Sequence, residues 1–150
     1  MKRLILFLLL VVSVPALAVQ PLLMARSSLK AEEAMEILKE TIQEYGYTIA
    51  HEQRCDGGMA EFDYKTDFYR VIFFGKLEEV RGILDAYPEM APFLPLKIAV
   101  IAEKDETLIT VLDPRALGSL YGGAPALRVQ FARWYNDLRA MLEELRTYKK

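Results

Sequence analysis

Two apolar runs rich in β-branched residues flank a polar Lys-Asp-Glu turn, and this pattern predicts an antiparallel β-hairpin over residues 93–114. With three residues in the turn, Glu103 would face Thr107, and Lys97 would face Asp113 at the open end. The two opposite charges would then meet across the strands. A shift of one residue would break this pairing and change which side chains share a face, so the register is a testable expectation.

The spacing of apolar residues predicts three helices and three further strands around the hairpin. Apolar residues recur at steps of three and four in the helical segments, whereas they alternate or run together in the strands. The predicted helices cover residues 30–45, 77–87 and 125–148, and the predicted strands cover residues 22–27, 47–53 and 68–74. The Asp-Gly-Gly sequence that follows the second strand indicates a turn, and three closely spaced prolines exclude a long regular element before the hairpin.

The resulting element order is β-α-β-β-α-β-β-α. Helices that neither alternate strictly with strands nor cluster at one end favour an α+β fold, in which a mostly antiparallel sheet packs against helices in two layers. An apolar share of 53% with 27% charged residues is typical of a folded chain. We therefore expect a single domain over residues 19–150.

The first 18 residues have the layout of a secretory signal peptide. A basic start that includes Lys2 precedes a short apolar stretch, and Ala-Leu-Ala at positions 16–18 provides a cleavage site. Cleavage there would release a mature protein that begins at Val19 and acts outside the cytoplasm, secreted or periplasmic. An uncleaved membrane anchor is the alternative, although Pro15 interrupts the apolar stretch before it reaches the about 20 residues that a span needs. The membrane is an expected partner only in that case.

Charge and cysteine content narrow the choice of partners. Residues 1–18 carry two basic residues and no acidic ones, so their removal changes the formal net charge from −2 to −4. A mildly acidic chain without a basic patch is not expected to bind nucleic acid. Cys55 is the single cysteine and cannot form an internal disulfide.

Few residues are candidates for catalysis, ligand binding or metal binding. Lys97 and Asp113 would either bind a polar ligand at the mouth of the sheet or hold the hairpin in register. His51, the single histidine, is a candidate ligand-binding residue, and His51 with Cys55 could contribute to a metal or haem site completed by other groups. No nucleophile elbow or glycine-rich phosphate loop is present in the sequence, and no particular cofactor is indicated.

The hairpin also suggests self-association, because both of its predicted faces are apolar. One predicted face carries Ile98, Val100, Ala102, Leu108 and Leu112, and the other carries Ala99, Ile101, Ile109 and Val111. An antiparallel sheet with one wet side would alternate apolar with polar residues instead. A second copy of the chain could cover the second face, giving a homodimer in which Ile109→Lys produces folded monomers. Alternatively, the last helix crosses to that face and the protein is monomeric.

The sequence resembles the domain of unknown function 302 family of small bacterial and archaeal proteins. The resemblance covers residues 22–145 and includes Leu-Pro-Leu-Lys at positions 94–97, a hairpin, and Asp-Pro at positions 113–114. It implies a two-layer α+β fold and frequent self-association, but no established reaction. Some members carry cysteines where this chain has Phe74 and Leu96, so the resemblance implies no thiol or metal role for these two positions.

Three functions are compatible with these observations. The first is an exported, non-enzymatic domain that binds a small ligand or a partner as a homo-oligomer. The second is an extracytoplasmic redox, metal or haem protein that uses His51 and Cys55. The third is an enzyme with Lys97 and Asp113 as an acid–base pair, and the absence of any catalytic motif makes the sequence lean away from it.

Overall fold

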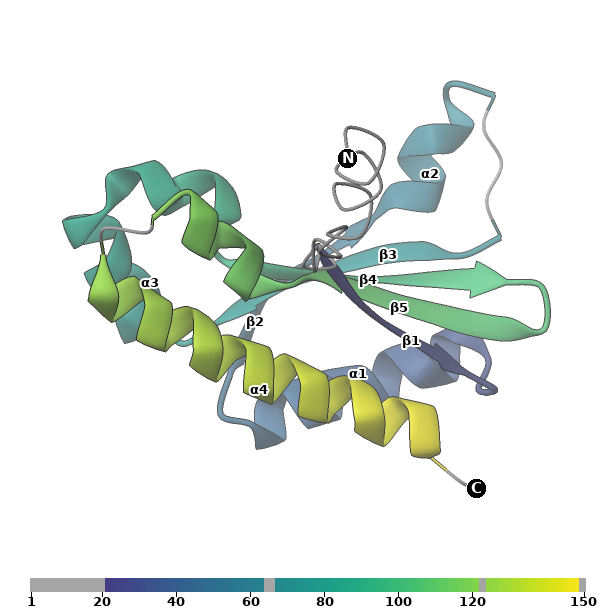
Figure 1. Ribbon diagram of the computed structural model, residues 1–150. Helices are drawn as coiled ribbons and strands as arrows, with labels where there is room; N and C mark the ends of the chain where they lie inside the picture. The colour runs from purple at the N-terminus through teal and green to yellow at the C-terminus, as the bar shows by residue number, and fades with distance from the viewer. Residues whose placement is uncertain (1–20, 64–66, 122–123, 149–150) are drawn as a thin grey trace, which may run out of the picture.

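The computed structural model describes residues 21–63, 67–121 and 124–148, and it contains a five-stranded antiparallel sheet (Figure 1). The strands lie in the order β1-β5-β4-β3-β2. Their bounds are Leu22–Ser27 for β1, Thr48–Arg54 for β2, Tyr69–Gly75 for β3, Leu96–Glu103 for β4 and Glu106–Leu112 for β5. The α+β class predicted from the sequence is therefore confirmed. The predicted signal peptide lies outside the described residues.

The three predicted helices are present as α1 (Ala31–Glu44), α3 (Leu77–Ala86) and α4 (Pro125–Thr147). Two 3₁₀ segments, η2 (Pro88–Phe93) and η3 (Pro114–Ser119), flank the β4–β5 hairpin along the chain, and both begin with a proline. Proline suits the first position of a helix because its missing N–H would have no partner there. None of the helices in the described ranges is long and apolar enough to cross a bilayer.

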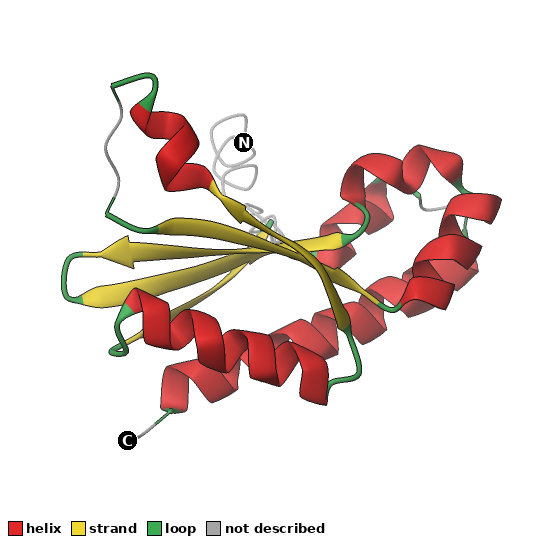
Figure 2. Cartoon of the chain, turned by 180° about the vertical axis from the view of Figure 1, so that it is seen from behind, coloured by secondary structure: helices red, strands yellow, loops and turns green. Residues whose placement is uncertain are grey.

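Helices α1 and α4 cover the same face of the sheet, as two opposite views show (Figures 1 and 2). We call this the helix-covered face. The sheet contributes Ile72, Phe74, Ile98, Val100 and Ile109 to it, all fully buried. Every apolar residue of the stripe predicted for α4 is buried as well: Leu127, Phe131, Trp134, Leu138, Met141, Leu142 and Leu145. The last helix therefore does not cross to the other side of the sheet, which we call the open face.

The predicted hairpin is present, but the predicted register is wrong by one residue. Glu103 pairs with Glu106, so the turn contains two residues rather than three. Lys104 occupies this turn with a φ of 54°, in the left-handed region that tight hairpin turns require. Arg26 on the neighbouring strand β1 lies between the two like-charged side chains, with its Nε 2.8 Å from Glu103 Oε2 and 3.9 Å from Glu106 Oε2.

Core packing explains the observed register. It pairs Ile98 with Val111 and Val100 with Ile109, which places four β-branched side chains together on the helix-covered face. The predicted register would instead pair Val100 with Thr110, so a hydroxyl would be directed into the core on the same face as a buried valine. The apolar packing of these four side chains therefore favours the two-residue turn, although the Thr110 hydroxyl is buried without a hydrogen-bond partner in this register as well.

The short helix α2 (Cys55–Ala60) occupies the place where the sequence predicted a turn at Asp56 and the two following glycines. Asp56 accepts a hydrogen bond from the backbone N–H of Gly57 at 2.8 Å and forms an ion pair with Arg70 of β3 at 2.5 Å. These two contacts hold the first turn of a segment that has low intrinsic helix propensity. Helix α2 has no buried residues and lies on the side of the sheet opposite to α1 and α4 (Figures 1 and 2).

Candidate functional site

Lys97 and Asp113 do not form the predicted pair. Lys97 lies on the open face, and its Nζ donates a hydrogen bond to the carbonyl oxygen of Pro92 at 2.7 Å. Asp113 is 1% exposed and follows Val111 by two residues, so its side chain is directed to the helix-covered face. The register shift is the physical reason for this separation, and it removes the acid–base pair that an enzyme hypothesis required.

Asp113 instead organises the start of η3. Its Oδ1 accepts a hydrogen bond from the backbone N–H of Arg115 at 2.9 Å, which is a helix N-cap interaction. The Arg115 guanidinium also lies 2.7 Å from Asp113 Oδ2 and stacks over the ring of Tyr135 on α4, 3.4 Å from its centroid. Asp113 therefore links the end of the hairpin to η3, and this buried carboxylate is not available to a ligand.

His51, Phe73 and Lys97 form a row across three neighbouring strands on the open face. The pairing of β2 with β3 and of β3 with β4 places Phe73 between the other two residues. The His51 ring centroid is 5.9 Å from that of Phe73, and Lys97 Nζ is 5.8 Å from the same ring. Two of the predicted ligand-binding candidates thus share one surface, on either side of an aromatic ring.

The structure does not bring His51 and Cys55 into a metal site. His51 contacts the side chain of Gln53, and the Cys55 thiol is 3.9 Å from the carbonyl oxygen of that same residue. Within the described residues, no group of three His, Cys, Asp or Glu side chains is placed to hold a metal ion. Burial and the nearby Asp56 carboxylate raise the pKa of the Cys55 thiol, which disfavours the reactive thiolate.

The open face carries apolar side chains that no described helix covers over β1, β5 and β4. Leu22, Met24 and Leu112 are 43%, 55% and 38% exposed. Half-buried residues continue this surface across β5, β4 and β3: Leu108, Thr110, Ala99, Ile101 and Val71. Neighbouring exposed apolar residues of this kind make the open face a candidate interaction surface.

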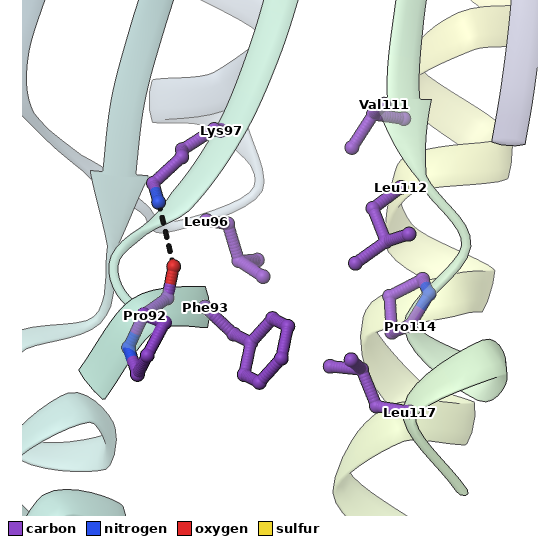
Figure 3. Close-up of a pocket in the computed structure, with 8 residues that line it drawn as sticks. All are labelled: Pro92, Phe93, Leu96, Lys97, Val111, Leu112, Pro114 and Leu117. Atoms are coloured by element: carbon purple, nitrogen blue, oxygen red, sulfur yellow. Dashed lines mark hydrogen bonds between the residues drawn. The ribbon is translucent and has the colours of Figure 1, made fainter. Parts of the chain in front are cut away.

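A small pocket lies where β4 and β5 separate beyond their last pair, between η2 and η3 (Figure 3). We call it the η2/η3 pocket. Its volume is about 90 Å³, and its walls are apolar except for Lys97. The apolar lining consists of Phe93, Leu96, Val111, Leu112, Pro114 and Leu117, together with Pro92. Sequence reasoning missed this pocket, and its only local signal was the group of prolines that ends regular structure on both sides of the hairpin.

A cluster of titratable groups lies at the middle of α4, and its members are partnered with one another. The Tyr47 hydroxyl donates a hydrogen bond to Asp137 Oδ2 at 2.5 Å, and Arg133 forms ion pairs with Asp137 and with Glu79 of α3. Burial and the bond to Asp137 raise the pKa of Tyr47 above its ordinary value. The ion pair between Arg133 and Glu79 links α4 to α3, whose half-buried Val80, Ile83 and Leu84 also pack against the core.

Comparisons with known proteins agree with the fold and add no activity. Residues 24–145 match the family model described as "Domain of unknown function DUF302". The fold is similar to that of an uncharacterised conserved DUF302 protein from Bacillus stearothermophilus solved by crystallography, with a TM-score of 0.76 and 21% sequence identity. That similarity covers 85% of this chain and 100% of the other. No curated protein matches the sequence.

Proposed function

We propose that this chain, which belongs to the DUF302 family of domains of unknown function, is an exported, non-enzymatic binding protein that acts as a homodimer through the open face of its sheet. The observation that carries the proposal is the exposure of Leu22, Met24 and Leu112 on a face that α1 and α4 leave uncovered. Burial of apolar surface is the main driving force for association. The export component rests on the basic and apolar pattern of residues 1–18.

The distribution of polarity over the open face favours one orientation of the two copies. Exposed apolar residues lie at the β1 edge, whereas the β2 edge presents the polar side chains of His51 and Gln53. In the proposed dimer the open faces of two sheets stack on each other. If the two-fold axis lies between the sheets and runs perpendicular to the strands, β1 of one copy lies on β1 of the other, so the apolar surfaces of the two copies meet. An axis parallel to the strands would place β1 on β2 and desolvate polar groups without partners.

The proposal is tested by measuring molar mass with light scattering at micromolar concentration. The wild-type protein should have twice the mass of one chain, and Met24→Glu should give a folded monomer, because it introduces a charge into the proposed interface. Val129→Glu is the matched control, since Val129 is 73% exposed on α4 and lies away from the sheet. Circular dichroism establishes that each variant is folded, and Leu112→Glu provides a second probe of the same face.

A monomeric wild-type protein would overturn the homodimer. A Met24→Glu protein that remains dimeric would show that the two copies meet elsewhere. Loss of the dimer in Val129→Glu as well would remove the evidence that the open face is the interface.

A further inference from the structure

The η2/η3 pocket combines apolar walls with a single cation. Lys97 Nζ donates one hydrogen bond, to Pro92, and an ammonium group has two further protons to donate. Among the described residues, no carboxylate lies within ion-pair distance of Lys97, whereas the neighbouring Arg115 is paired with Asp113. Figure 3 shows Lys97 on the β4 side of the pocket, with the Phe93 and Leu117 side chains directed into the space below it.

The walls of the pocket are held by residues with little conformational freedom. Pro92 and Pro114 lie on opposite sides, in η2 and η3, and the ring of each proline restricts its own φ angle. Leu96 and Leu117 are 8% and 5% exposed, so both are fixed by packing. A preformed apolar site loses little conformational entropy when it is occupied.

The size and polarity of the pocket define a class of ligand. A volume of about 90 Å³ is smaller than the apolar cavity of about 150 Å³ that accommodates benzene, so a short alkyl group suits it better than an aromatic ring. Lys97 supplies a positive charge at the pocket wall, where an acidic group of the same ligand would form a charge-assisted hydrogen bond. We propose that the η2/η3 pocket binds short-chain aliphatic carboxylates of about four to six carbons, with the alkyl chain between Phe93 and Leu117 and the carboxylate on Lys97.

This inference goes beyond the proposed homodimer: all of the lining residues come from one chain, although one of them, Leu112, also belongs to the open face. The test is a titration of the purified protein with butanoate, pentanoate, hexanoate and octanoate, followed by NMR chemical shifts. Each added methylene that enters the pocket should tighten binding about fourfold, and the gain should stop once the pocket is filled.

Two variants probe the head group and the tail separately. Lys97→Met preserves the apolar stem and removes the charge, so it should weaken binding of hexanoate about tenfold and leave binding of hexan-1-ol unchanged. Lys104→Met is the matched control, because Lys104 is an exposed lysine in the hairpin turn at the other end of β4. Leu117→Ala enlarges the pocket and should shift the preferred chain length upward by about one or two carbons.

Equal affinity of the wild-type protein and Lys97→Met for hexanoate would overturn the role of Lys97. Affinity that does not change with chain length, or no binding at about 10 mM hexanoate, would overturn the assignment of the pocket. If Leu117→Ala fails to fold, the comparison of Lys97→Met with Lys104→Met decides the proposal alone. Light scattering on the same samples reports the dimer independently, so failure of the pocket and failure of the dimer are distinguishable.

Discussion

Replacement of Asp113 tests the arrangement that separates this structure from the one expected from the sequence. Asp113→Ala removes an N-cap acceptor, which costs about 1 kcal/mol in helices. It also removes the ion pair with Arg115, whose side chain is 47% exposed, so solvent screening reduces that contribution to about 0.5 to 1 kcal/mol. We therefore expect Asp113→Ala to lower the free energy of unfolding by about 2 kcal/mol.

One further substitution divides this loss into its parts, and a second measures the contribution of Lys97. Asp113→Asn retains an oxygen that can accept from the backbone N–H of Arg115, so it should lose only the ion-pair contribution, about half of the total. Lys97→Ala should cost about 0.5 kcal/mol, because its one hydrogen bond, to Pro92, is exposed to solvent.

Urea unfolding of the wild-type protein, Lys97→Ala, Asp113→Ala and the double variant provides the decisive measurement. Lys97 and Asp113 lie on opposite faces of the sheet and have different partners, so their effects should add to within about 0.5 kcal/mol. A coupling energy above about 1 kcal/mol would refute the reasoning, because it would show that the two charges meet as the three-residue turn requires.

Three other outcomes can be checked directly. Intact-mass measurement of the exported protein should give a chain that begins at Val19, whereas an intact N-terminus in the membrane fraction would establish an anchor. Gly75→Ala should destabilise the protein by about 1 to 3 kcal/mol in urea unfolding, since its new Cβ would lie 2.9 Å from a methyl of Val80. Gly82→Ala should instead stabilise the protein by about 0.5 to 1 kcal/mol, because a Cβ at this position of α3 meets open space and alanine has the higher helix propensity. Tyr47→Phe should lower the free energy of unfolding by about 1 kcal/mol at neutral pH. Because folding raises the pKa of Tyr47, the stability difference between the wild-type protein and Tyr47→Phe should be complete below about pH 10, the ordinary pKa of tyrosine. Unfolding measurements should show this difference decline as the pH rises further.

Local periodicity was sufficient to predict α1, α3 and α4, but not the short helix α2. The buried stripe of α4 is confirmed at every predicted position. One face of that helix is apolar and the other is polar, so only one orientation of the helix about its own axis buries the apolar face against the sheet. The hairpin lacks such a contrast, since both of its strands carry apolar residues on both faces. Its register depends on the turn, and Lys104 adopts a left-handed conformation without the glycine or asparagine that would have signalled it.

The candidate site was harder to predict because its parts are distant in the sequence. Lys97 was identified from its charge, but the pairing expected with Asp113 depended on the wrong register. Phe93 and Leu117 are apolar residues in two short 3₁₀ segments, and only the folded chain places them on two sides of one pocket. Sequence spacing carries no information about such a contact between η2 and η3.

The register also determines which experiment can test self-association. The sequence placed Ile109 on the second, uncovered face, so Ile109→Lys was expected to give folded monomers. In the structure Ile109 pairs with Val100 and is fully buried beneath the helices, so a lysine there would place a charge in the core and unfold the chain. Loss of the dimer in that variant would report only loss of the fold. Met24 is 55% exposed on the open face, so a charge at this position can separate two copies while the core remains intact.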